Sequence, residues 1–266
     1  MYNTTYHRAA SVDEAASLLA TNDEAKLISG GQTLLPTMKQ RLAAPSDLVD
    51  LRHVASMKGI TIDANKVRIG AATTHAQVAA SAELRAVCPG ICDLASHIGD
   101  PHVRHMGTIG GSIANNDPSA CYPSAMMALN AHIITNKRTI DTDDFFTGMF
   151  ETALEEAEIV VAVEFAAPAK SAYAKFPNPA SRYAMAGVFA AKLKNGMARV
   201  GVTGAGMEGV FRWEEAEEAL NANWSAEALD GLSVDTDNML EDMHASADYR
   251  ANLVKVMAKR AVAAAG

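Results

Sequence analysis

Two short glycine-rich segments, far apart in the chain, share one pattern of a glycine pair with hydroxyl side chains beside it. The first is Ser29-Gly30-Gly31-Gln32-Thr33 and the second is Thr108-Ile109-Gly110-Gly111-Ser112. Glycine tolerates positive φ and lets a ligand approach the backbone closely. Successive backbone N–H groups in such a turn form a nest that attracts an anion. Two nests from separate segments can therefore hold one diphosphate between two parts of a fold.

The glycine pairs have a second explanation as simple tight turns. Neither segment contains the dinucleotide fingerprint G-x-G-x-x-G or the P-loop pattern, so those two modes of phosphate binding are not indicated. The residues by themselves leave the ligand and the turn interpretations open.

The residues before position 55 predict a small α/β unit. Ser11 to Glu14 reads as a capping box that opens a helix. Short apolar runs predict strands over residues 26–29 and 48–51, and residues 34–42 are compatible with a helix. Strand, helix and strand in this order are typical of a layered α/β fold.

From residue 59 the pattern changes to short strands with turns between them. Alternating apolar residues predict a hairpin over 60–69, and Thr74 to Gln77 reads as a second capping box. A partly helical stretch over 84–98 contains an interruption at Pro89-Gly90. Further strands are expected at 132–135, 138–140 and 159–165.

The last hundred residues begin with a segment, 169–181, that is rich in Ala, Pro and Ser and reads as linker-like. Asn195-Gly196 lies between two apolar runs and is the strongest hairpin signal in the chain. Residues 248–265 have helical spacing of apolar side chains.

Composition excludes several classes of protein. The chain has 266 residues and a net charge of −8, which does not match the basic surface of a nucleic-acid binder. No stretch approaches the roughly 20 apolar residues of a membrane span, and the first ten residues have no secretory apolar region. The three cysteines, Cys88, Cys92 and Cys121, are too few for an iron–sulfur cluster and indicate a reducing, cytoplasmic compartment.

No constellation of catalytic side chains stands out, and we predict no acid, base or nucleophile. His97, His102 and His105 invite a metal hypothesis, but their spacing is not that of a standard zinc site and no carboxylate or cysteine completes it. We therefore predict no metal site and expect a polar loop that is exposed or meets a partner.

The two glycine segments also carry a resemblance to a known family. Residues 27–39 and 98–114 closely resemble the two FAD-binding motifs of the medium subunit of aerobic carbon monoxide dehydrogenase and of its xanthine dehydrogenase relatives, the molybdenum hydroxylases. The resemblance continues through residues 143–148, 178–183 and 244–250, so it covers nearly the whole chain in order.

The resemblance implies an α+β fold. It consists of a PCMH-type FAD-binding fold of two α/β subdomains and a C-terminal α+β domain like that of the carbon monoxide dehydrogenase flavoprotein. The expected boundaries are residues 1–55 for the N-terminal subdomain, 56–168 for the middle subdomain and 169–266 for the C-terminal domain.

The resemblance also implies the residues that bind FAD. The first motif would follow the diphosphate and ribityl chain, and the second would hold the other side of the diphosphate. Ile98 and Val103 match positions that line the rings, Asn115 and Asp117 match polar positions nearby, and residues around Ile159 and Lys175 would close the site. The implied set is Lys26, Leu27, Ile28, Ser29, Gly30, Gly31, Gln32, Thr33, Leu34, Ile98, Val103, Gly107, Thr108, Ile109, Gly110, Gly111, Ser112, Asn115, Asp117, Ile159 and Lys175.

One position departs from the family pattern. The family usually has an aspartate three residues after the proline of the second motif, and here Cys121 follows Pro118-Ser119-Ala120. A carboxylate beside the flavin would alter its redox behaviour, so the substitution leaves that role and the electron acceptor undefined. Asp117 is a candidate substitute, and Cys121 itself is expected to be a small buried residue.

The implied function is electron transfer within a complex. A large subunit would carry the molybdenum cofactor, and a small subunit would carry two [2Fe–2S] clusters. This chain would pass their electrons through FAD to an external acceptor, in a dimer of heterotrimers. Carbon monoxide dehydrogenase is the nearest likeness, and a xanthine-, heterocycle- or aldehyde-oxidising relative is the alternative. A stand-alone FAD oxidoreductase, an assembly module without FAD and a nucleotide-binding regulator remain as other classes.

Overall fold

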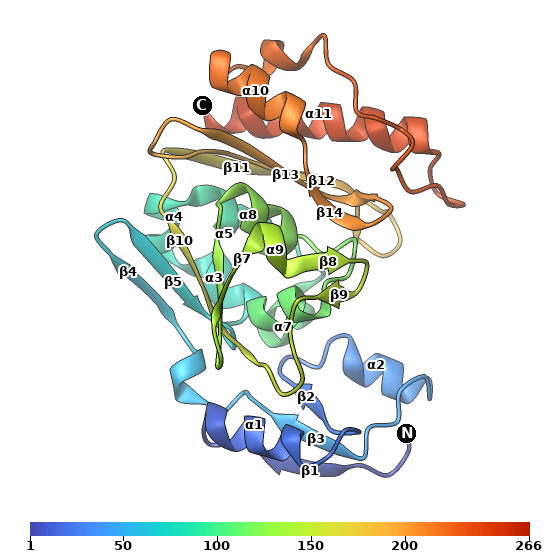
Figure 1. The fold of residues 1–266 in the computed structure, drawn as a ribbon. Helices are drawn as coiled ribbons and strands as arrows, with labels where there is room; N and C mark the ends of the chain where they lie inside the picture. The colour runs from blue at the N-terminus through green and yellow to red at the C-terminus, as the bar shows by residue number, and fades with distance from the viewer.

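Three main β-sheets follow one another along the long axis of the molecule, and helices cover each of them (Figure 1). The computed structural model describes all residues from 1 to 266. The sheets occur in sequence order, from the N-terminal lobe at one end to the C-terminal helices at the other.

The N-terminal lobe is a three-stranded parallel sheet of order β1-β3-β2. Its helix α1 begins where predicted, because the Ser11 side chain accepts a hydrogen bond from the Glu14 N–H at 3.1 Å. The helix expected over 34–42 ends earlier, since Arg41 adopts a positive φ of 62°. The elements are β1 Thr5–Arg8, α1 Val12–Ala20, β2 Lys26–Ile28, α2 Leu34–Lys39, β3 Asp47–Asp50 and the 3-10 turn η1 Ala55–Met57.

The middle part contains a five-stranded antiparallel sheet of order β4-β5-β10-β6-β7 and a separate two-stranded hairpin, β8-β9. Its strands are β4 Ile60–Asp63, β5 Lys66–Gly70, β6 His132–Thr135, β7 Thr139–Asp141, β8 Phe146–Gly148, β9 Glu151–Thr152 and β10 Val160–Ala166. Its helices are α3 His75–Ala80, α4 Ala82–Val87, α5 Pro89–Ser96, α6 Pro101–Met106, α7 Ile109–Asn115, α8 Tyr122–Ala128 and α9 Thr142–Phe145.

Local sequence signals account for most boundaries in this part. The capping box predicted at Thr74 and Gln77 is present in both directions at the start of α3. The interruption predicted at Pro89-Gly90 is present, since α4 ends at Val87 and Pro89 begins α5. A proline is tolerated at that first position because its missing N–H has no partner there anyway. The second glycine pair, expected in a turn, lies instead in the first turn of α7.

The C-terminal part is a four-stranded antiparallel sheet of order β11-β12-β13-β14. The Asn195-Gly196 hairpin is confirmed, with Gly196 at a φ of +91° between β12 and β13. The linker-like prediction for residues 169–181 is wrong, because residues 170–177 form β11 and pair with β12 along their length. The elements are β11 Lys170–Pro177, β12 Ala184–Lys192, β13 Ala198–Gly206, β14 Gly209–Arg212, α10 Glu214–Ala222, the 3-10 turn η2 Ala226–Leu229 and α11 Ala247–Ala265.

Both faces of this last sheet are covered. Helices α5 and α8 of the middle part pack on one face, and α10 and α11 pack on the other. All nine residues of β13 are therefore buried. A Cβ atom on Gly201 would lie 2.0 Å from the carbonyl oxygen of Ser124, so strand and helix backbones touch at this point. At this point the middle and C-terminal parts are packed together without an intervening side chain. No helix is long and apolar enough to span a bilayer.

This contact gives the first prediction. We expect Gly201→Ala to lower the free energy of unfolding by about 1–3 kcal/mol, because the added methyl group overpacks a backbone-to-backbone contact. Gly231→Ala is the matched control, since nothing lies within 4 Å of the Cβ position there. Urea unfolding measures both. An unchanged urea midpoint for Gly201→Ala would show that strand β13 and helix α8 pack less closely at this point than described.

Candidate functional site

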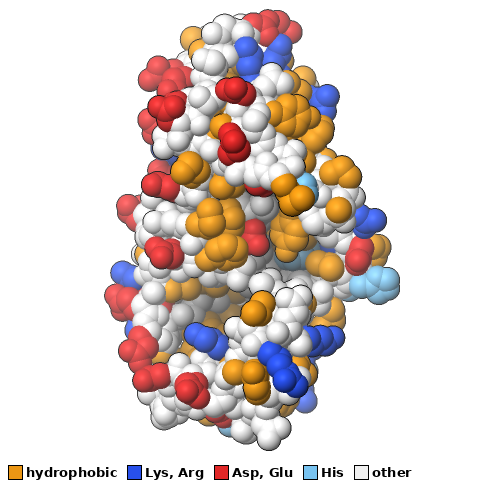
Figure 2. Space-filling model, turned by 90° about the vertical axis from the view of Figure 1, so that its right-hand side faces the viewer, with side chains coloured by type: hydrophobic (Ala, Val, Ile, Leu, Met, Phe, Trp, Pro, Cys, Tyr) orange, Lys and Arg blue, Asp and Glu red, His pale blue; other side chains and the backbone are white.

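A cavity of about 1170 Å³ lies between the N-terminal lobe and the other two parts of the molecule. Its size exceeds the roughly 300–1,000 Å³ typical of pockets for small ligands, so it suits a long ligand such as a dinucleotide. The wall includes the loop after β2, the start of α7 and the segment around Tyr183 between β11 and β12. Figure 2 shows the hollow on the face where the N-terminal lobe meets the rest of the chain.

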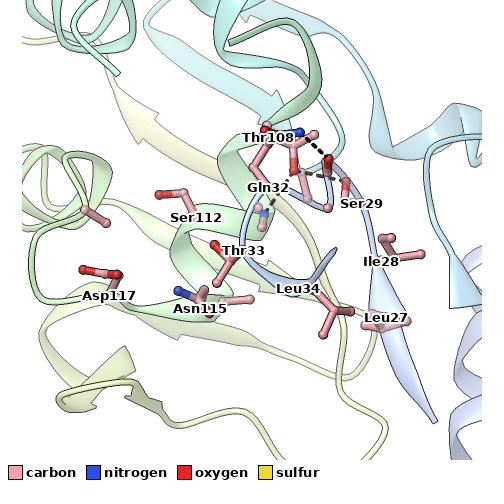
Figure 3. A pocket seen from close by; sticks show the side chains of 18 of the residues that line it. Leu27, Ile28, Ser29, Gln32, Thr33, Leu34, Thr108, Ser112, Asn115 and Asp117 are labelled. Atoms are coloured by element: carbon pink, nitrogen blue, oxygen red, sulfur yellow. Dashed lines mark hydrogen bonds between the residues drawn. The ribbon is translucent and has the colours of Figure 1, made fainter. Parts of the chain in front are cut away.

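The first glycine segment supplies unpaired backbone donors. The chain leaves β2 after Ile28 and turns at Gly31, which has a φ of +68°. The backbone N–H groups of residues 30–33 donate to no other atom of the chain. Gln32 and Thr33 are exposed on the cavity side of this loop (Figure 3). Such a run of free N–H groups is a nest for an anion.

The second segment contributes fewer donors than predicted. The N–H groups of Ile109 and Gly110 are already used, by the carbonyl oxygens of Thr73 at 3.1 Å and Ala71 at 2.9 Å. The prediction that all amides of residues 108–112 face a ligand is therefore wrong. These two hydrogen bonds hold α7 against the residues that follow strand β5. Buried N–H groups need such acceptors. The segment offers the cavity Thr108, Gly111 and Ser112 instead.

The two segments nevertheless meet. The Thr108 hydroxyl donates to the Ser29 hydroxyl oxygen at 3.1 Å and accepts from the Gly111 N–H at 3.2 Å (Figure 3). A Cβ atom on Gly30 would lie 2.4 Å from the Met106 carbonyl oxygen and 2.5 Å from the Gly107 Cα. Glycine at position 30 is thus required by the close approach of the two backbones.

The structure places the predicted binding residues around one cavity with a single exception. Ile109 has no exposed surface and packs in the main hydrophobic core, so it cannot contact a ligand. The others all line the wall: Lys26, Leu27, Ile28, Ser29, Gly30, Gly31, Gln32, Thr33, Leu34, Ile98, Val103, Gly107, Thr108, Gly110, Gly111, Ser112, Asn115, Asp117, Ile159 and Lys175.

Comparison with known proteins identifies the family. Residues 2–168 match the family described as the FAD binding domain in molybdopterin dehydrogenase. The chain belongs to this family of FAD-binding medium subunits. It is 32% identical to the nicotine 6-hydroxylase medium subunit of Paenarthrobacter nicotinovorans over 98% of this chain and 96% of the relative. It is 33% identical to the carbon monoxide dehydrogenase medium chain of Hydrogenophaga pseudoflava, over 98% and 96%.

A solved structure agrees with the sequence comparison. Reconstituted CO dehydrogenase from Oligotropha carboxidovorans superimposes with a TM-score of 0.90 and 32% identity, covering 99% of this chain and 97% of that one. The α+β fold implied by the resemblance is therefore confirmed, as are membership among the oxidoreductase subunits of molybdenum hydroxylases and FAD as the cofactor.

Cys121, at the position where the resemblance led us to expect an aspartate, lines the cavity of this medium subunit. Cys121 is buried, and its sulfur lies 3.4 Å from the Lys175 ammonium, which also donates to the His97 carbonyl oxygen at 3.0 Å. Asp117 lines the same cavity, and burial raises the pKa of its carboxyl above the ordinary value. The lysine therefore faces a thiol rather than a carboxylate, and Asp117 is a separate carboxylate in the cavity wall.

His75 is a cavity residue that the sequence did not reveal. It is the first residue of α3 and is 5% exposed, and its Nδ1 has no hydrogen-bond partner. Burial, with a smaller contribution from the positive charge of Arg104, lowers the pKa of His75 to about 4. The ring is therefore neutral near pH 7. Its position after a capping threonine gave no sign of this, because burial depends on Gly107 at the end of α6 and on the Tyr122 ring of α8, which lie against it.

Arg182 and Tyr183 also line the wall and were not among the predicted binding residues, although the family resemblance runs through them. The histidines of the polar loop do not converge. The rings of His97 and His105 bond backbone carbonyl oxygens at 2.7 Å, and the His102 side chain is 98% exposed. No group of three metal-binding side chains is present in the chain.

The His75 environment gives the second prediction. Because the folded pKa is below the unfolded value, the unfolded chain binds the extra proton, so stability decreases as the pH falls from about 6.5 to 4. Relative to His75→Gln, the wild-type chain should lose up to about 3 kcal/mol of unfolding free energy over this range. Urea unfolding at several pH values measures the difference, with His102→Gln as the exposed control. Parallel pH profiles for the wild type and His75→Gln would contradict the buried neutral ring.

Proposed function

We propose that the free N–H groups of residues 30–33 hold the diphosphate of FAD, with Ser112 supplying a hydroxyl donor from the opposite wall. The observation that carries this proposal is the unpaired run of donors in a glycine loop that faces the cavity. Donors that are unpaired in the chain are satisfied when a phosphate binds, and the glycines leave room for its close approach.

The remaining cavity residues fit the rest of an FAD molecule. The apolar side chains of Ile98, Val103 and Ile159 suit the faces of its rings, and Asn115 and Asp117 offer polar contacts. We propose that every predicted residue except Ile109 contacts the cofactor. FAD supplies the ability to take up and release electrons singly or in pairs, and this chain binds, orients and electrostatically tunes it.

We further propose that the chain works as the electron-transfer subunit of a larger complex. Its three cysteines are buried, unpaired thiols that do not form a cluster, so the iron–sulfur centres belong to a small partner subunit. The molybdenum cofactor belongs to a large subunit. A dimer of heterotrimers, an external electron acceptor and a cytoplasmic location complete the proposal, the last supported by the unpaired thiols.

The oxidised substrate is proposed to be selected by the large subunit. Relatives named for nicotine and for carbon monoxide share 32% and 33% identity with this chain, so the identity does not separate the two branches. We propose that this chain contributes no acid, base or nucleophile to the oxidation of that substrate. A stand-alone oxidoreductase would need a substrate site, and the C-terminal sheet is occupied on both faces by packed helices.

The three sheets suggest a division into domains. We propose an N-terminal FAD-binding subdomain of residues 1–55, a middle FAD-binding subdomain of 56–168 and a C-terminal domain of 169–266. Each proposed range contains one of the main sheets.

The third prediction tests the cofactor site. Gly111 is exposed, and a Cβ there would meet only the Thr108 hydroxyl, at 3.0 Å. We expect Gly111→Val to fold and to lose bound FAD, because a branched side chain would occupy the cavity side of the α7 first turn and displace that hydroxyl. Visible flavin absorbance per chain measures the loss.

Lys39→Ala is the control, since Lys39 is exposed at the end of α2 and does not line the cavity. It should keep its flavin. A Gly111→Val chain with normal flavin content would show that FAD does not lie against α7. Turnover of an organic substrate by the purified chain alone would favour the stand-alone oxidoreductase instead.

A further inference from the structure

The three thiols of the chain lie in different surroundings. Cys88, just before α5, and Cys92, within it, have no exposed surface and do not line the cavity. Burial raises the pKa of Cys88 to about 12 and that of Cys92 to about 11, so both thiols stay protonated near pH 7. Cys121, just before α8, is 4% exposed and is the one cysteine in the cavity wall. A small molecule in the cavity can therefore meet Cys121 but not the other two.

Strand β11 places two polar side chains against Cys121. The Lys175 ammonium donates to the Cys121 sulfur at 3.4 Å. Tyr173 lies two residues earlier on the same strand, and side chains two residues apart point to the same face of a sheet. Burial and then the neighbouring Cys121 thiol raise the pKa of Tyr173 well above its ordinary value, so the phenol and the thiol lie next to each other.

The Tyr173 hydroxyl lacks a partner. The residue is only 8% exposed, and its oxygen atom makes no hydrogen bond within the chain. A buried hydroxyl without a partner destabilises a folded protein, whereas a hydrogen bond to a charged acceptor is stronger than an ordinary one. An anionic or oxygen-bearing group at Cys121 would give this donor the acceptor that it lacks.

A cation beside a thiol also affects the reactivity of the sulfur. The thiolate is the nucleophilic form, and a neighbouring lysine ammonium stabilises it. Oxidation of cysteine by peroxides follows both the thiolate character of the sulfur and its accessibility. Cys121 combines a contact to Lys175 with a position in the cavity wall, and Cys88 and Cys92 have no access to the cavity.

We propose that Cys121 is a modification site, at which hydrogen peroxide oxidises the thiol to a sulfenic acid. The thiolate sulfur attacks one oxygen of the peroxide, so that a sulfur–oxygen bond forms and the oxygen–oxygen bond breaks. Hydroxide leaves and takes up the proton that the thiol released, which gives water. The sulfur is oxidised by two electrons and the peroxide is reduced by two.

The added oxygen lies at the position where the resemblance led us to expect a carboxylate. It accepts hydrogen bonds from the Lys175 ammonium and the Tyr173 hydroxyl, which both face Cys121. No second cysteine lines the cavity, so the sulfenic acid has no neighbouring thiol there with which to form a disulfide. A reduced flavin that reacts with oxygen would supply the peroxide inside the cavity, and this source rests on the proposed function.

The fourth prediction concerns the three thiols of the wild-type chain. The purified chain is treated with hydrogen peroxide, the peroxide is removed with catalase, and the chain is unfolded in dimedone, which traps sulfenic acids. Mass spectrometry of the peptides then gives the labelled fraction of each cysteine. We expect Cys121 to be labelled about tenfold or more above Cys88 and Cys92, because it alone combines a neighbouring cation with access from the cavity. Cys121→Ser should remove this label and leave the other two cysteines unlabelled.

Variants of β11 test the surroundings of the sulfur. Lys175→Met should slow the labelling of Cys121 by about tenfold, as loss of a hydrogen bond from a charged donor does. Lys175→Arg keeps the positive charge and should restore most of the rate. Lys170→Met is the matched control, since Lys170 lies on the same strand and does not line the cavity. Tyr173→Phe, which removes only the unpartnered hydroxyl, should also slow the labelling.

Equal labelling of the three cysteines, or an unchanged rate at Cys121 in Lys175→Met, would overturn the proposal. Strong labelling of Cys88 and Cys92 in Lys175→Met would show that this variant is unfolded, and the rate in Tyr173→Phe then decides. The peroxide is added from outside, so the result does not depend on bound FAD. Flavin content is measured in the same preparations, and a chain that takes up no FAD would contradict the proposed function alone.

Discussion

The rest of the site depends on how one glycine loop is held. The N–H groups of residues 30–33 have no acceptor in the chain, and the loop keeps its shape because it is pressed against the segment that precedes α7. The Thr108 to Ser29 hydrogen bond and the close approach at Gly30 fix the two segments together. Donors without partners are costly where water is excluded, so this arrangement favours an anionic ligand that satisfies them.

The other parts of the molecule complete the cavity around that loop. Strand β13 supports the residues that follow α7, because the Thr203 hydroxyl donates to the carbonyl oxygens of Pro118 and Ala120. Strand β11 brings Lys175 to the Cys121 thiol from the C-terminal sheet. The C-terminal part therefore forms some of the cavity wall, although the family match covers only residues 2–168. A cysteine, where the family pattern led us to expect an aspartate, therefore lies beside a lysine in the cavity wall.

Stability and function act against each other at several of these positions. The buried His75 with an unpaired nitrogen and the unpaired donors of the glycine loop each carry a local cost. Both line the cavity. Elsewhere the structure follows its local signals closely, as at the capped starts of α1 and α3. Departures from local preference are expected to gather where a ligand or a partner compensates for them.

The sequence by itself determined the starts of α1 and α3, the hairpins at 60–69 and at Asn195-Gly196, the family, and a set of binding residues of which all but Ile109 line the cavity. These depend on short-range rules such as capping and turn chemistry, or on motifs that stay contiguous in the chain. Only the tertiary structure decided that Ile109 and the N–H of Gly110 face inward, that residues 170–177 form a strand and that His75 is buried at the cavity. Each of these depends on a partner that lies in a separate element. The partners are the residues that follow strand β5 for α7, strand β12 for β11, and Gly107 with the Tyr122 ring for His75. The local sequence of a segment does not indicate which of the segment's N–H groups and apolar side chains such a partner will cover.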